Sequence, residues 1–97
     1  MNYPELKKKY IQVFDHVSNH RIKETFSTLD SLVGECSNRE LSTNLDSHKE
    51  TYRNILKYSF ELTDDPEKEK VYKRLMRNIL ELADDIKEDI ILSQQLL

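Results

Sequence analysis

The chain has 97 residues, of which 37% are hydrophobic and 34% are charged, and its net charge is −3. One glycine and two prolines provide too few tight turns for an all-β or α/β fold, and a single cysteine excludes an internal disulfide framework. The mild acidity disfavours nucleic acid and anionic membranes as general partners, and no apolar run approaches membrane-spanning length.

The apolar spacing predicts a first helix from Pro4 to about Val17, followed by a short turn over residues 18–20. Asn2 is the expected N-cap, and Glu5 stands where the reciprocal carboxylate of a capping box belongs. The expected buried face of this helix is Leu6, Tyr10, Val13, Phe14 and Val17.

A second helix is expected from about Arg21 to Val33, and the two short helices should form an antiparallel hairpin. Gly34, the only glycine, follows the last periodic residue and is expected to end the helix in a left-handed conformation. The expected buried face is Ile22, Phe26, Leu29, Leu32 and Val33.

Ser37 and Glu40 have the spacing of a second capping box, so a third helix should begin at Asn38 and run to about Leu62. A turn over residues 63–66 then leads into the last helix. The third helix should bury Leu41, Leu45, His48, Tyr52, Ile55, Leu56, Ser59 and Leu62.

The fourth helix is expected from Pro66, capped by Asp65, to about Leu92. Its length of about 39 Å exceeds what a compact globule of this size, with a radius of gyration of about 12–13 Å, can hold. Either the molecule is elongated, or the far end of the long hairpin meets another domain or subunit. The expected buried stripe is Val71, Tyr72, Leu75, Ile79, Leu82, Ala83, Ile86 and Ile90.

These elements define an all-α fold of four helices, two short and two long, with short connections and antiparallel hairpins in a bundle. Residues 1–97 should form one helical domain, either free-standing or the N-terminal part of a larger helical protein. A lone Cys36 makes the reducing cytoplasm the expected compartment.

The sequence offers little for chemistry. His16 and His20 are four residues apart, but the expected helix end between them favours exposed or capping roles over metal binding. His48 is expected to be half-buried among tyrosines, and Cys36 to be an inert loop thiol. Since di-iron, calcium-loop and phosphate-loop motifs are absent, no enzyme activity, cofactor or small-molecule substrate is predicted.

The charges of the fourth helix are segregated by sign. Lysine and arginine dominate its first half and carboxylates its second, so several like charges stand four residues apart. The acidic half also lies at the negative end of the helix dipole. The candidate partner-binding residues are Lys73, Arg74, Arg77, Glu81, Asp84, Asp85 and Glu88.

Three interpretations of this pattern stay open. The face can be a solvated surface whose small electrostatic costs are outweighed by packing on the other side. It can pair with an antiparallel copy of the same helix, which sets the basic half against the acidic half. A basic partner domain against the acidic half is the third interpretation.

Residues 19–26, Asn-His-Arg-Ile-Lys-Glu-Thr-Phe, resemble the turn and second-helix start of a tetratricopeptide repeat, and the likeness spans about residues 10–33. Arg21, Ile22, Glu24 and Phe26 match the pattern of such a repeat, whereas His20 stands in place of its usual glycine and Thr25 in place of its small alanine. The resemblance implies a helical-hairpin scaffold, and such repeats usually bind other proteins.

The expected function is therefore a non-enzymatic protein–protein interaction or scaffold module, self-associating through the long C-terminal helix or binding another protein. The alternative is a small helical regulator that binds nucleic acid, through residues 7–9 and the basic half of the last helix, or a small ligand.

Overall fold

The computed structural model describes residues 1–58 and 66–96, which form four α-helices and, within those ranges, no strand. The helices are α1 (Tyr3–Ser18), α2 (Ile22–Val33), α3 (Arg39–Tyr58) and α4 (Pro66–Gln94). The predicted all-α fold, with two short and two long helices, is confirmed. The expected third-helix end at Leu62, the buried position of Ser59 and the Asp65 cap lie outside the described residues.

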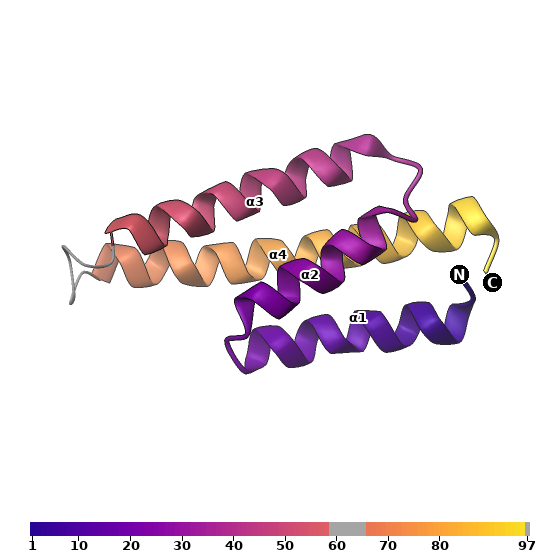
Figure 1. The fold of residues 1–97 in the computed structure, drawn as a ribbon, viewed down its shortest axis with the longest axis horizontal. Helices are drawn as coiled ribbons and strands as arrows, with labels where there is room; N and C mark the ends of the chain where they lie inside the picture. The colour runs from indigo at the N-terminus through magenta and orange to yellow at the C-terminus, as the bar shows by residue number, and fades with distance from the viewer. Residues whose placement is uncertain (59–65, 97) are drawn as a thin grey trace.

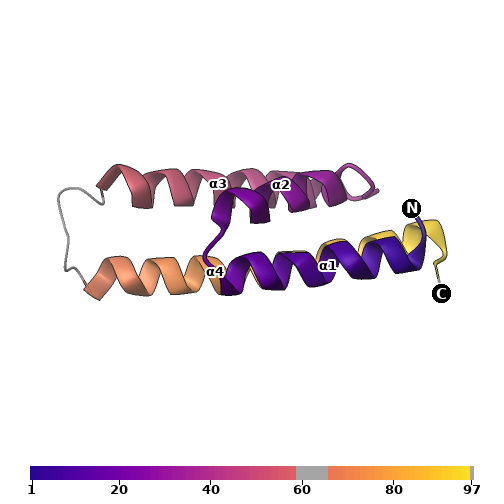
Figure 2. The same ribbon diagram turned by 60° about the horizontal axis from the view of Figure 1, so that its bottom comes forward.

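The helices form two layers, with α2 and α3 in one and α1 and α4 in the other (Figure 2). α1 and α3 both run antiparallel to α4, on its two flanks, and α2 lies between them (Figure 1). Contacts between distant residues follow this order: Tyr10 meets Asp84, and Ser37 meets Asp89. The chain ends lie together at one end of the bundle, while the α3–α4 hairpin extends beyond the other two helices (Figure 1).

The core is built around the predicted stripe of α4. Ile79, Ala83, Ile86 and Ile90 are completely buried there, because α1, α2 and α3 all cover this side of the helix. Burial of this many aliphatic side chains is the main favourable contribution to folding. The other helices contribute Leu6, Val13, Leu29, Leu32, Leu41 and Leu45 to the same cluster.

Three residues expected in the core are instead exposed: Phe14 by 36%, Leu56 by 46% and Val71 by 38%. Leu56 follows Tyr52, whose ring packs on Phe26 of α2, by one helical turn, and Val71 directly precedes Tyr72, which contacts His20 of the α1–α2 turn. Both therefore lie near the end of the cover that α1 and α2 provide. Phe14 lies at the edge of the α1 stripe, where it meets the ring of Tyr10 edge-on. The helical period predicts the face of a side chain but not where the covering helices end.

The molecule is elongated, with extents of 47 × 24 × 17 Å and a radius of gyration of 14.4 Å. This radius exceeds the value of about 12–13 Å for a compact domain of this length. Of the two consequences expected from a long fourth helix, the elongated shape is confirmed.

The helix ends show which local rules hold. The Asn2 side chain accepts a hydrogen bond from the Glu5 amide at 2.9 Å, so the predicted first cap is confirmed. The expected cap by Ser37 is wrong: Asn38 accepts the Glu40 amide instead, and Ser37 is bound to α4. The predicted turn after the first helix is present at residues 19–20, with Ser18 still in α1, and His20 takes a left-handed conformation with φ of 57°.

The expected left-handed conformation of Gly34 is also wrong. Its φ of −60° and ψ of −21° are right-handed, and the helix ends through tight turns in which Glu35 donates to Leu32 and Cys36 to Val33. Glycine is therefore not required by the backbone at this position.

We expect Gly34→Ala to stabilise the protein by about 0.4–1 kcal/mol, because alanine loses less chain entropy on folding. An added Cβ would meet the Ser31 carbonyl oxygen at 3.5 Å, an ordinary contact. Urea denaturation followed by circular dichroism measures the change. A loss of stability would show that the position needs glycine after all.

The core assignment predicts that Ile86→Ala costs about 2–5 kcal/mol, because it leaves a cavity at a completely buried site. Leu92→Ala, in the same helix at a site that is 75% exposed, is the matched control and should change stability by less than about 0.5 kcal/mol. Equal effects of the two substitutions in urea denaturation would contradict the assignment of the buried stripe.

Candidate interaction surface

All seven candidate residues are exposed on α4, on the side opposite its buried stripe. At about 100° per residue, positions 70, 77, 81 and 88 point almost directly away from Ile79. Lys70 belongs to this surface as well, although it was not among the predicted residues; the repeated spacing of four between Lys70 and Arg74 is the signal for it. We call this surface the α4 outer face: Lys70, Lys73, Arg74, Arg77, Glu81, Asp84, Asp85 and Glu88.

Few of these charges have partners within their own chain. Lys70 and Lys73 form ion pairs with glutamates one turn earlier, at 3.6 and 3.1 Å. Over the described ranges, no ion pair or hydrogen bond engages the side chains of five residues of the outer face. These five are Arg74, Arg77, Glu81, Asp85 and Glu88.

Asp84 is the one carboxylate of the face that the fold itself uses. It accepts a hydrogen bond from the Tyr10 hydroxyl of α1. Burial of the phenol, together with the bond to Asp84 and its charge, raises the pKa of Tyr10 to about 12. The ammonium group of Lys87 lies 4.2 Å from the centre of the Tyr10 ring, which adds a cation–π contact. Asp84 therefore fixes the edge of the outer face that borders α1.

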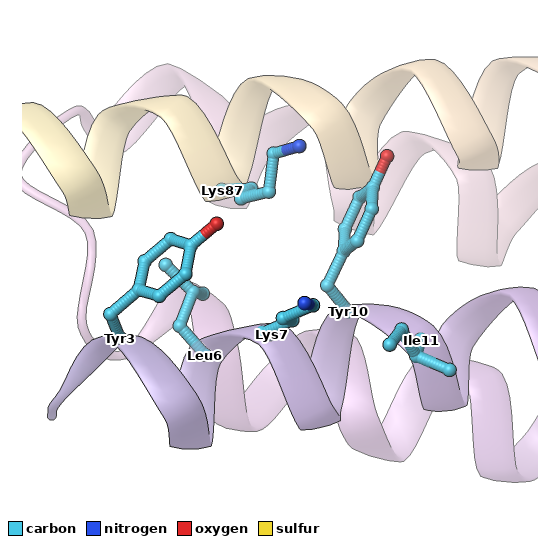
Figure 3. Close-up of a pocket in the computed structure, with 6 residues that line it drawn as sticks. All are labelled: Tyr3, Leu6, Lys7, Tyr10, Ile11 and Lys87. Carbon is cyan, nitrogen blue, oxygen red and sulfur yellow. The ribbon is translucent and has the colours of Figure 1, made fainter. Parts of the chain in front are cut away.

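A shallow groove lies beside this contact, between the first turns of α1 and Lys87 of α4 (Figure 3). Its volume of 180 Å³ is smaller than the roughly 300 Å³ at which sites for drug-sized ligands begin. Ile11 and Tyr3 line it and are 54% and 39% exposed. A groove of this size accommodates a side chain of a partner more readily than a small molecule.

Two further hollows lie beside α3. One, of 200 Å³, is lined by His48 of α3 and by Glu81 and Asp85 of α4. Burial lowers the pKa of His48, which favours its neutral imidazole. The other, of 320 Å³, lies between α2 and α3, where Lys49 is paired with Asp30 at 2.6 Å.

The two histidines that the sequence analysis weighed as metal ligands differ in their surroundings. His20 is exposed, and its Nδ1 lies 3.0 Å from the hydroxyl of Tyr72 on α4. His16, for which an exposed or capping role was expected, is half-buried, and its Nδ1 has no hydrogen-bond partner. The described part of the chain holds no group of three or more histidine, cysteine, aspartate or glutamate side chains placed to bind a metal ion.

On the opposite flank, Asp89 holds the α2–α3 loop. It accepts the amide of Ser37 at 2.8 Å and the Ser37 hydroxyl at 2.9 Å. Partial burial favours the neutral acid, but the hydrogen bonds from Ser37 outweigh it and lower the pKa of Asp89. Burial, followed by the charge of Asp89, raises the pKa of the neighbouring Cys36 to about 12, so this thiol is protonated at neutral pH.

The lowered pKa of Asp89 predicts a pH dependence of stability. Since the folded-state pKa is below the unfolded value of about 3.9, the contribution is present above that value and is lost as pH falls through the folded pKa. Asp89→Asn should cost about 1 kcal/mol at pH 7 and progressively less below about pH 4. Urea titrations of both proteins across this range measure the difference, and a pH-independent difference would contradict the role of the charge.

Comparison of the chain with protein-family models, with curated proteins and with solved structures finds no match. Among the described residues, no helix combines the length and the apolar composition that crossing a membrane requires.

Proposed function

We propose that this protein is a non-enzymatic interaction module that binds a protein partner through the α4 outer face. The observation that carries the proposal is the separation of charge by sign along one exposed strip, in which five charged side chains have no partner in the described part of the chain. Like charges four residues apart destabilise an isolated helix, and a partner of complementary charge would relieve that cost.

The setting of the face supports this proposal. The buried stripe fixes α4 against the other three helices. On the two flanks of α4, Tyr10 is hydrogen-bonded to Asp84 and Ser37 to Asp89. A rigid surface loses little conformational entropy when it binds. The antiparallel packing of α1 against α2 is the kind of scaffold that the resemblance to tetratricopeptide repeats implies.

The alternative, a regulator that binds nucleic acid or a small ligand, has less support. The second half of α4, which follows the basic half directly, carries five carboxylates when Asp89 is counted. These carboxylates would repel a phosphate backbone. We place the module in the cytoplasm because its only cysteine is kept as a half-buried, protonated thiol.

Site-specific photo-crosslinking in cells tests the proposal. A benzophenone amino acid in place of Arg77, in the middle of the outer face, should give a protein adduct that mass spectrometry identifies. The same amino acid in place of Lys8, which is exposed on α1 away from the face, is the control and should give none. The crosslinking is then repeated with the purified proteins. If 0.5 M salt prevents formation of the adduct there, the result agrees with electrostatic docking.

Absence of any adduct at Arg77, or equal adducts at both positions, would contradict the assignment of the face.

A further inference from the structure

We propose that the partner is a second copy of this chain, bound antiparallel through the α4 outer face with a two-fold axis at the level of Ile79. This inference rests on the proposed function and names the occupant of the same surface. The inference uses two positions of each charged residue: its place along the helix axis and its place between the two edges of the face.

The face has two edges and a midline. Lys73, Arg77 and Asp84 lie along the edge next to α1, where Tyr10 contacts Asp84. Arg74, Glu81 and Asp85 lie along the edge next to α3, where both carboxylates border the hollow that His48 lines. Lys70 and Glu88 lie on the midline, directly opposite the buried stripe.

A two-fold axis that relates antiparallel helices brings each edge against the same edge of the partner, with the direction of the chain reversed. Each edge must therefore complement itself, and each edge of this helix does so. Cations occupy the half before Ile79 and carboxylates the half after it, on both edges and on the midline. A parallel pair would set like charges against each other.

The position of the axis fixes which residues face each other. With the axis at Ile79, the numbers of two facing residues, one from each copy, add up to about 158. Lys70 then faces Glu88 of the other copy on the midline. Arg74 lies between Glu81 and Asp85 of the other copy. On the edge next to α1, Lys73 and Arg77 lie on either side of the other copy's Asp84.

A shift of one heptad in either direction removes the match. It brings Lys73 next to Arg77 of the other copy on the edge beside α1 in one case, and Glu81 next to Asp85 of the other copy on the edge beside α3 in the other. Since like charges repel each other across an interface, the charges favour one register. The interface consists of exposed ion pairs, which are individually weak and screened by salt, so the dimer should be reversible and should dissociate at high ionic strength.

Disulfide trapping of the purified chain tests the register, in a Cys36→Ala background. Lys70→Cys and Glu88→Cys are prepared separately, and circular dichroism verifies that both fold. Mixed in low salt under mild oxidation, they should form a covalent dimer of twice the 11.6 kDa chain mass within minutes. Each variant alone should remain largely monomeric, since identical positions lie about 27 Å apart along the axis in this register.

Sedimentation equilibrium of the unmodified chain provides the second measurement. We expect reversible dimers at 20 mM salt that dissociate at 500 mM. Arg74→Glu with Arg77→Glu should be monomeric at both, because only Lys70 and Lys73 then remain as cations on a face that carries six carboxylates. Adding Glu81→Arg and Asp85→Arg to that variant reverses every charge on the edge next to α3, so opposite charges face each other there again and the dimer should return.

A monomer at low salt and at about 1 mM protein, or faster crosslinking of Lys70→Cys to itself than to Glu88→Cys, would overturn the antiparallel dimer. Failure of self-association together with a different protein crosslinked at Arg77 in cells would leave the interaction function intact. Failure of both experiments would remove the function as well.

Discussion

The structure depends on a single buried stripe. Ile79, Ile86 and Ile90 of α4 are fully enclosed because α1, α2 and α3 cover the same side of one helix. A small domain has little apolar surface to bury, so a shared stripe of this kind provides most of its stability. The same arrangement leaves the opposite side of α4 uncovered along the helix.

The uncovered side is where the sequence departs from local helix rules. Like charges stand one turn apart, and carboxylates crowd the end of the helix at which the dipole disfavours them. Each such cost is a few tenths of a kcal/mol, which the burial of a single isoleucine on the other side outweighs. The core therefore permits a charge pattern that an isolated helix would not favour, and such departures from local rules are expected at functional surfaces.

The flanks of α4 show how a polar contact can overrule a local motif. Ser37 has the spacing of a capping box, yet its amide and hydroxyl both bind Asp89, and Asn38 caps α3 instead. A charged acceptor on α4 attracts these donors more strongly than a neutral helix end does. Tyr10 likewise reaches Asp84 instead of being fully buried.

The sequence by itself determined the four helices, their ends to within one or two residues except for the C-terminal end of α3, and the buried stripe of α4 apart from Val71. Each of these depends on neighbours within a few residues. It also located the seven charged candidates on one face. Only the tertiary structure decided that Val71 and Leu56 are exposed, and that Gly34 needs no left-handed backbone. It alone brought α1 and the α2–α3 loop to the two edges of the outer face. Those outcomes depend on how separate helices pack on each other, and the spacing of apolar residues within one helix does not contain that information.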